Sequence, residues 1–402
     1  MSLRSLARPA PAAPPGDGRP VWLSLAALAV GGFGIGTTEF ATMGLLPQVA
    51  DDLGATIPAA GHLVSAYALG VVVGAPLLAV LGARLPRRAL LLGLMVAFTV
   101  GNAASALAPS FGSLFAFRFL SGLPHGAYFG IASLVAASLV PPERRARAVS
   151  GMMLGLPVAN ILGVPLSTLL GQSLGWRSTY WTVAVLGGLT VLAVARFVPH
   201  LEAATDATPR RELGALRSPQ VLLTLLVGAI GFGGFFAVYS YITPLLTEVS
   251  GYRESAVPVA LALVGLGMTL GTVLGGRFAD RSVVRTITGG LCSVVVVLLL
   301  LPLVAHSVVG VAVGAFCMGT TSSLMLPALQ TRLMDVGGEA QALAAAMNHS
   351  ALNMANALGA YLGGAVIAAG HGYTSPALVG AVLTAAGLLV LAVSVALDRR
   401  AG

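Results

Sequence analysis

Long runs of predominantly apolar residues follow one another along this chain, separated by short polar connections. Each run is long enough to cross a hydrocarbon core of about 30 Å, which takes about 20 residues in a helix. The short connections allow backbone polar groups to be satisfied inside the helices, as lipid requires. The expected spans are 21–46, 58–81, 89–108, 113–140, 148–170, 178–199, 219–246, 257–279, 283–304, 307–331, 341–369 and 374–396. The pattern predicts an all-α integral membrane protein with twelve transmembrane helices.

The composition strengthens this prediction. Of the 402 residues, 56% are hydrophobic and only 9% are charged, whereas soluble domains carry about a quarter charged residues. The 51 glycines exceed the usual share of about 7% and favour close packing of helices in lipid. All 22 basic residues are arginine. The absence of lysine excludes a P-loop lysine and a Schiff-base lysine. The sequence also contains no H-E-x-x-H metal motif and no catalytic constellation among its polar residues. We therefore expect no enzymatic activity, no metal and no cofactor.

The arginines define the orientation in the membrane. When the successive connections between the twelve spans are assigned to alternate sides of the membrane, all but three of the 22 arginines fall on one side. Arg177 and Arg253 lie on the other side, and Arg118 lies inside a span. The positive-inside rule then places both termini in the cytoplasm of a cell bounded by a plasma (inner) membrane. The same bias accounts for the net charge of +8 without a nucleic-acid partner.

The longest internal polar segment divides the spans into two sets of six. We expect a disordered cytoplasmic leader at 1–20, an N-terminal six-helix bundle at 21–199 and a cytoplasmic central loop at 200–217. A C-terminal six-helix bundle at 218–396 and a cytoplasmic tail at 397–402 complete the chain.

The two sets of spans resemble each other in sequence. Gly70 and Gly74 recur 197 residues later as Gly267 and Gly271, and residues 159–163 are echoed by residues 355–359. Internal repeats in a membrane chain are typical of transporters that rock two halves about a central site.

Several motifs resemble those of the major facilitator superfamily, and within it the twelve-helix drug:proton antiporters. The loop motif Gly276-Arg277-Phe278-Ala279-Asp280-Arg281 is complete in the second half, whereas the first half has Ala83 where the Asp belongs. The fourth span carries Arg118-Phe119-Leu120-Ser121-Gly122. Residues 36–47 and 121–126 look like the arabinose-efflux and chloramphenicol-efflux permeases. The resemblance implies the twelve-helix fold of two pseudo-symmetric bundles and export of a small organic compound in exchange for protons.

Glu39 is the one acidic residue that falls inside a predicted span. A charged carboxylate there costs a few kcal/mol, so it should face a cavity or a partner. Counting from the outer end of each helix places Glu39 at a depth of about 12 Å and Arg118 at about 9 Å. Glu39 is expected to carry the coupling proton and Arg118 to set its affinity. The other interpretation is a permanent ion pair that fixes the packing of the first and fourth spans.

Polar and aromatic residues in other spans are candidates for the proton path and the substrate cavity. His125 shares a helical face with Arg118 and is either a proton relay or a hydrogen-bonded structural residue. His349 and Asn353 are expected in the cavity, whereas Asn160 and Asn356 either line it or join neighbouring helices. Phe236 and Tyr239 belong to an aromatic stripe that serves either packing or substrate binding. The expected cavity set is thus Asn160, Phe236, Tyr239, His349, Asn353 and Asn356.

Charged residues in the loops are candidates for an inner gate. Arg84, Asp280 and Arg281 are expected to make charge contacts that hold one conformation closed. The positive-inside rule alone accounts for the positions of Arg84 and Arg281, but it does not account for an aspartate at position 280.

These features together predict a secondary active transporter, driven by protons as the coupling ion and functional as a monomer. Scarce charge within the spans disfavours a highly charged substrate and favours a neutral or weakly cationic amphipathic compound. A sugar exporter, an uncoupled facilitator and a non-transporting membrane sensor remain as other interpretations.

Overall fold

The computed structural model describes residues 20–55, 57–201, 210, 213–253, 256–338 and 340–401. Within them, twelve helical segments are long and apolar enough to cross a membrane. The predicted all-α fold class and the predicted number of spans are confirmed. The expected leader, apart from Pro20, and most of the central loop lie outside the described residues.

Among the described residues, the first six spans are formed by eight α-helices and one π-helical turn. Spans one to four and span six are single helices, α1 (Val21–Ala41), α3 (Ile57–Leu81), α4 (Arg87–Ala106), α5 (Phe111–Ser138) and α9 (Arg177–Phe197). The fifth span is divided into α6 (Arg145–Met153), α7 (Gly155–Val158), the π-helical turn Ala159–Gly163 and α8 (Val164–Leu174). Pro157 and Pro165 flank this turn, and a proline inside a helix removes a backbone donor. The short α2 (Leu46–Asp52) follows the first span.

The second six spans are also helical, and here the seventh span is the one that contains a π-helical turn. The seventh span combines α11 (Pro219–Leu226), the π-helical turn Val227–Gly231 and α12 (Gly233–Tyr239), followed by the short α13 (Ile242–Pro244). The remaining spans are α14 (Val257–Ala279), α15 (Val283–Val304), α16 (Val308–Leu324) with α17 (Leu326–Val336), α18 (Gln341–Ala368) and α19 (Ser375–Ala401). Because α19 continues to Ala401, most of the predicted tail is helical.

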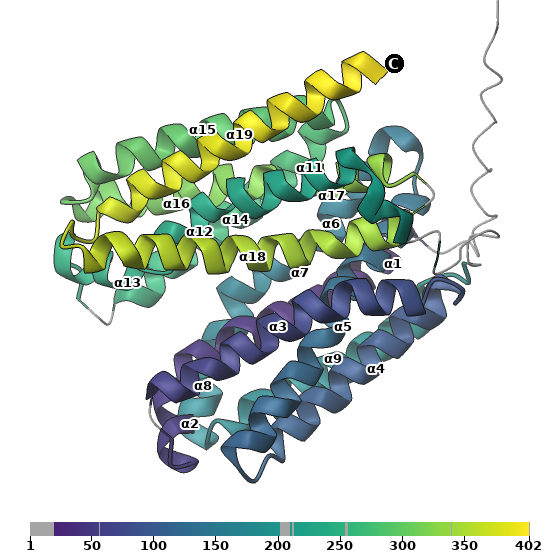
Figure 1. Cartoon of the computed structure of the whole chain (residues 1–402). Helices are drawn as coiled ribbons and strands as arrows, with labels where there is room; N and C mark the ends of the chain where they lie inside the picture. The colour runs from purple at the N-terminus through teal and green to yellow at the C-terminus, as the bar shows by residue number, and fades with distance from the viewer. Residues whose placement is uncertain are drawn as a thin grey trace, which may run out of the picture.

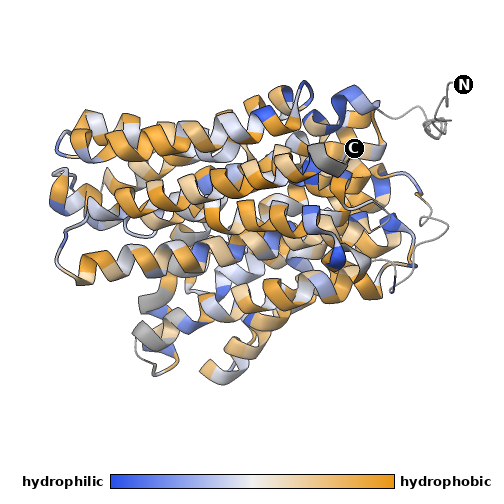
Figure 2. Ribbon diagram, turned by 45° about the horizontal axis from the view of Figure 1, so that its top comes forward, coloured by the Kyte–Doolittle hydropathy of each residue, from blue (hydrophilic) through white to orange (hydrophobic). Residues whose placement is uncertain are grey.

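Apolar residues run along the lengths of the helices, and polar residues gather towards their ends (Figure 2). The helices form two groups, one from each half of the chain (Figure 1). Glycines that are repeated in the sequence make close contacts inside each group. A Cβ atom on Gly74 of α3 would lie 2.1 Å from the carbonyl oxygen of Leu123 in α5. A Cβ atom on Gly271 of α14 would lie 2.0 Å from that of Thr320 in α16. The sequence repeat therefore corresponds to a repeated helix contact.

The two groups meet on the side of the bundle that carries Pro20 and Asp398, called here the terminal side. There α6 packs against α14 and α17, and α18 packs against α3 and α5. Ser150 of α6 donates a hydrogen bond to the carbonyl oxygen of Thr272 in α14, with a donor–acceptor distance of 2.6 Å. Towards the opposite side the groups diverge (Figure 1). The structure is therefore closed on the terminal side.

Candidate functional site

A cavity lies between the two groups of helices, with about 800 Å³ of empty space when the part that is open to solvent is included. Its wall includes all six residues of the predicted cavity set, together with two of the three predicted proton-coupling residues, Glu39 and His125. Arg118 is not part of the wall. Helices from both halves supply this lining, so any movement between the halves changes its shape.

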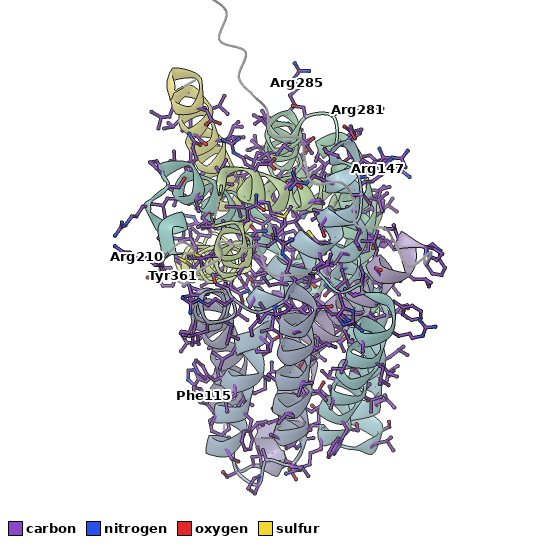
Figure 3. All side chains as sticks on the ribbon, turned by 90° about the vertical axis from the view of Figure 1, so that its right-hand side faces the viewer. Phe115, Arg147, Arg210, Arg281, Arg285 and Tyr361 are labelled. Atoms are coloured by element: carbon purple, nitrogen blue, oxygen red, sulfur yellow. The ribbon has the colours of Figure 1, made fainter. Side chains whose placement is uncertain are left out.

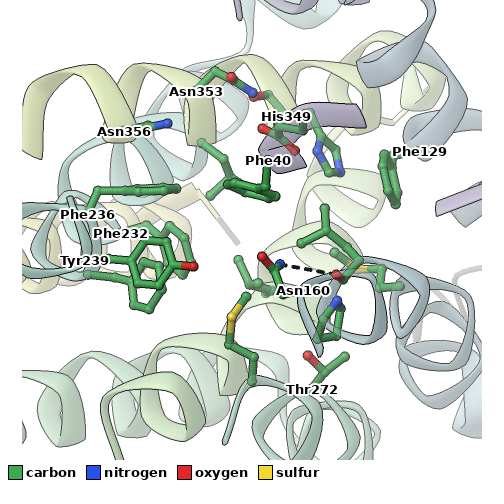
Figure 4. Close-up of a pocket in the computed structure, with 18 of the residues that line it drawn as sticks. Phe40, Phe129, Asn160, Phe232, Phe236, Tyr239, Thr272, His349, Asn353 and Asn356 are labelled. Atoms are coloured by element: carbon green, nitrogen blue, oxygen red, sulfur yellow. Dashed lines mark hydrogen bonds between the residues drawn. The ribbon is translucent and has the colours of Figure 1, made fainter. Parts of the chain in front are cut away.

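One wall of the cavity is aromatic. Phe232, Phe235, Phe236 and Tyr239 come from the seventh span, where the π-helical turn meets α12. Their rings contact one another, and Phe235 stacks on Tyr239 with 5.0 Å between ring centroids. Figure 4 shows this wall on one side of the cavity, with Phe129 of α5 on the other. Such rings favour a ligand with a planar or apolar portion.

Amide side chains supply polar groups between these walls. Asn160 donates to the carbonyl oxygen of Leu156 at 3.3 Å, and Asn353 donates to that of His349 at 2.9 Å. Both bonds use the amide nitrogen, so both amide oxygens are available to accept from a ligand. Asn356 also lines the cavity.

Glu39 carries the only carboxylate among the described residues that line the cavity. Glu39 and Arg118 both belong to the described residues, and they do not form an ion pair with each other. Arg118 is completely buried and donates instead to Thr38, to the hydroxyl oxygen at 3.0 Å and to the carbonyl oxygen at 3.2 Å. Its guanidinium also lies 4.4 Å from the centre of the Tyr67 ring. A permanent Glu39–Arg118 ion pair, one of the two interpretations of the sequence, is therefore not present in this conformation.

His125 and His349 join the two halves at the cavity wall. The Nε2 atom of His125 in α5 lies 3.2 Å from the Nδ1 atom of His349 in α18. The Nδ1 atom of His125 lies 3.2 Å from the hydroxyl oxygen of Tyr67 in α3. The His349 ring also stacks on Phe129, with 4.2 Å between centroids. The two histidines, predicted for separate roles, thus belong to one hydrogen-bonded group.

The predicted gate has different partners in the structure. Asp280 pairs with Arg147 at the start of the fifth span, with Nε and Oδ2 2.7 Å apart, and also accepts from the Arg147 backbone N–H. Arg84 and Arg281 are exposed, and neither pairs with Asp280. Arg147 and Arg281 lie in the same region of the terminal side (Figure 3). Asp280 thus makes a charge contact on the closed side, as expected, but its partner is Arg147. No ion pair of Arg84 or Arg281 is found among the described residues.

A second ion pair joins the halves beside the first. Arg145 of α6 lies 3.4 Å from Asp335 of α17, between Nη1 and Oδ1. Arg145, Arg147 and Asp335 are not among the gate residues predicted from the sequence, where the two arginines are explained by the positive-inside rule alone. Their spacing offered a signal, since two arginines two residues apart open the fifth span.

Known proteins resemble this chain over most of its length. The sequence profile of the Major Facilitator Superfamily matches residues 28–348. The inner membrane transport protein YdhP of Escherichia coli strain K12 is 44% identical over 370 residues, which cover 92% of this chain and 95% of that protein. A chloramphenicol resistance protein of Streptomyces lividans is 35% identical over 372 residues, with the same coverages of 92% and 95%.

Solved structures share the fold at lower identity. The crystal structure of the human organic anion transporter MFSD10 superimposes with a TM-score of 0.74 and 16% identity. The match covers 93% of this chain and all of that one. At this identity the similarity shows the arrangement of helices and nothing about the substrate.

Proposed function

The chain belongs to the major facilitator superfamily, and from this membership we propose that it exports a small organic compound across the inner membrane in exchange for protons. It is a multi-pass membrane protein, and the relatives that it matches are transporters. Both termini are placed in the cytoplasm in this proposal, because the arginines of the connections concentrate on that side. The cavity between the halves is the proposed substrate site.

The observation that supports proton exchange is the position of Glu39. A carboxylate in a cavity with an apolar surround is costly while it is charged and unpaired. A bound proton removes that cost, and so does a ligand that is cationic or donates hydrogen bonds. Because the same carboxylate serves both, proton and substrate compete for it, and each favours a different conformation. Competition of this kind couples the inward movement of protons to the outward movement of substrate.

The lining of the cavity defines the expected substrate class. No arginine is among its described wall residues, so an anion would find no cationic partner there. The aromatic wall and the amides of Asn160 and Asn353 suit a neutral or weakly cationic amphipathic compound. Chloramphenicol is a suitable first compound to test, because one relative is named for resistance to it.

Alternating access requires that the contacts on the terminal side break. With the termini in the cytoplasm, the structure corresponds to an outward-facing state. The Arg147–Asp280 and Arg145–Asp335 pairs then form the closed inner gate. Opening towards the cytoplasm separates both pairs and lets the substrate reach the cavity.

Proton movement in proteoliposomes tests this function. The purified protein is reconstituted with an internal pH-sensitive dye, and chloramphenicol, L-arabinose and ethidium are added in turn. We expect one of them to release a proton flux, and Glu39→Gln to abolish it. Glu248→Gln serves as the matched control, because Glu248 is exposed in the π-helical turn Leu245–Val249 and does not line the cavity.

Other outcomes contradict the proposal in different ways. Movement of a compound without proton flux would identify an uncoupled facilitator or sugar exporter and would remove the coupling role of Glu39. Saturable binding without any flux in the wild-type protein would identify a sensor.

A further inference from the structure

A line of three hydrogen-bonding side chains crosses from one half of the molecule to the other. It runs from the Tyr67 hydroxyl to Nδ1 of His125, and from Nε2 of His125 to Nδ1 of His349, with 3.2 Å for each step. The three residues lie on α3, α5 and α18 and are nearly inaccessible to solvent. The far nitrogen of the line, Nε2 of His349, is buried and has no hydrogen-bond partner among the described residues.

The positions of the protons follow from the properties of these groups. A neutral imidazole has one N–H donor and one acceptor nitrogen, whereas a tyrosine hydroxyl carries one proton. If Tyr67 donates to Nδ1 of His125, then His125 carries its proton on Nε2 and donates to Nδ1 of His349. The proton of His349 must then lie on Nε2. Every hydrogen-bonding group in the line has a partner in this arrangement, except that last N–H.

The reverse direction is less favourable. If His349 donated from Nδ1 and His125 donated from its own Nδ1 to Tyr67, the Tyr67 proton would have no acceptor among the described residues. Nε2 of His349 would also remain without a donor. Two buried polar groups would then be unsatisfied instead of one, and each such group costs about 1–3 kcal/mol. The arrangement in which Tyr67 donates to His125 and His125 donates to His349 is therefore the more stable one.

We propose that His349 presents an Nε2–H donor at the cavity wall and selects substrates that carry a neutral oxygen acceptor next to a planar group. This inference rests on the proposed function and specifies the substrate chemistry of the same cavity. Tyr67 and His125 act as positioning residues. Their hydrogen bonds keep the proton of His349 on Nε2, and the substrate contacts only that atom of His349.

The surroundings of His349 define where the acceptor sits on the ligand. The ring is stacked on Phe129 at 4.2 Å, with 17° between the planes, and both residues line the cavity, so a planar ligand group next to the acceptor has aromatic neighbours. Carbonyl, hydroxyl, ether and nitro oxygens all accept from an imidazole N–H. Because the Nε2 atom is buried and has no hydrogen-bond partner among the described residues, a ligand acceptor that reaches it satisfies an otherwise unpaired donor. Loss of that acceptor weakens binding more than at an exposed site.

Nitrogen NMR of the histidines tests the position of the proton. The full-length protein is labelled with ¹⁵N-histidine, reconstituted in lipid nanodiscs and measured at about pH 8, where free imidazole is neutral. Spectra of His125→Gln and His349→Gln identify the two sets of signals, and exposed His371 is the internal reference. We expect the His349 proton on Nε2, and Nδ1 shifted as a hydrogen-bond acceptor. Tyr67→Phe should move the His125 Nδ1 signal to its unbonded position. A His349 proton on Nδ1 overturns the inference.

Ligand binding tests the selectivity. Two probes are titrated into the same nanodiscs: chloramphenicol, which carries amide, hydroxyl and nitro oxygens, and ethidium, an aromatic cation without oxygen. His349→Leu should weaken chloramphenicol binding by about tenfold and ethidium binding by less than about twofold. His349→Gln keeps an N–H donor and should recover most of the chloramphenicol affinity.

The controls separate this inference from the proposed function. Equal losses for both probes in His349→Leu would show a packing effect and overturn the assigned donor, as would unchanged chloramphenicol binding. If neither probe binds the wild-type protein, the proposed substrate class fails, and the NMR experiment alone decides whether the donor exists.

Discussion

Arg118 donates hydrogen bonds to both oxygen atoms of Thr38, the residue directly before Glu39 in α1. The contact fixes the rotation of α1 about its axis where Thr38 faces α5. Neighbouring residues on a helix point about 100° apart, so Glu39 is turned from Arg118 towards the cavity. Thr38 in turn donates to the amide oxygen of Asn102 in α4 at 2.7 Å. One buried threonine thus links three helices and orients the carboxylate.

Thr38→Val should destabilise the protein. The substitution preserves shape but removes a hydroxyl, which leaves the Arg118 guanidinium with one acceptor fewer and Asn102 without its donor. Loss of such buried partners costs about 1–3 kcal/mol. Thermal unfolding in detergent measures the change. Thr37→Val is the matched control, because among the described residues the Thr37 hydroxyl bonds only to Phe33 of its own helix. Equal destabilisation by the two variants would contradict the bridging role.

Asp280→Asn should favour the conformation that is open on the terminal side. The Asp280 side chain is 4% exposed and loses its charged partner Arg147. Partly exposed ion pairs contribute about 1 kcal/mol, which corresponds to a shift of about fivefold in the conformational equilibrium. The rate at which a maleimide labels a cysteine introduced at Thr272, in the cavity wall, measures this shift from each side of the membrane.

Two further variants test the origin of that shift. Arg285→Ala removes an exposed arginine of the same loop region and should leave labelling unchanged. Exchanging the charges in Arg147→Asp with Asp280→Arg should restore most of the closed population. A shift of the same size in Arg285→Ala would show that net charge, rather than the pair, controls closure.

Gly74→Ala and Gly271→Ala should each destabilise the half that contains them. A methyl group at either position would lie about 2 Å from a carbonyl oxygen of the packed helix, and overpacking of this kind costs about 1–3 kcal/mol. Gly93→Ala and Gly289→Ala are matched controls on α4 and α15, since no atom of another described helix lies within 4 Å of the added Cβ. The controls should be neutral or slightly stabilising. Denaturant-induced unfolding monitored by tryptophan fluorescence provides the comparison.

Asp52 should make stability depend on pH. It accepts hydrogen bonds from Arg177 at 2.5 Å and from Trp176 at 3.0 Å. These bonds, that of Arg177 first, lower the pKa of the Asp52 carboxyl below its ordinary value. A lowered pKa stabilises the folded state above the pKa of the unfolded chain, and that stabilisation is lost as the pH falls through the folded-state pKa.

The measurement compares Asp52→Asn with the wild-type protein in melting experiments across this pH range. The variant should melt lower near neutral pH, by a small amount because the pair is exposed, and the difference should vanish on acidification. Asp51→Asn, which changes the neighbouring exposed carboxylate, should show a smaller difference at neutral pH. A difference between Asp52→Asn and wild type that is independent of pH would contradict the ionic origin.

The sequence predicted features that depend on one helix at a time. The number of spans follows from hydrophobic length, and the presence of Glu39 and Asn353 at the cavity follows from the cost of polar groups in lipid. The family was also predicted correctly from its motifs.

Features that depend on register between helices were not predicted. The depths of Glu39 and Arg118, estimated from helix length, predicted that the two residues lie at one level. The rotation of the helices about their axes was not predicted, and Arg118 bonds to Thr38 instead of Glu39. The Arg147–Asp280 pair joins residues 133 positions apart, and the His125–His349 contact joins residues 224 apart. Such pairings are determined by how the halves dock, which no local pattern encodes.

The glycine contacts inside each half have a mechanical consequence. Where the backbones of two helices are in contact, as those of α3 and α5 are at Gly74, the helices have little room to shift past each other. We therefore expect each half to move as a rigid body, like a lever. A lever arm of about 20 residues is about 30 Å long, and a tilt of about 10° moves its tip by about 5 Å. A displacement of that size is comparable to the width of an aromatic ring. Small changes at the cavity can thus become a passage at the membrane surface, with little deformation of either half.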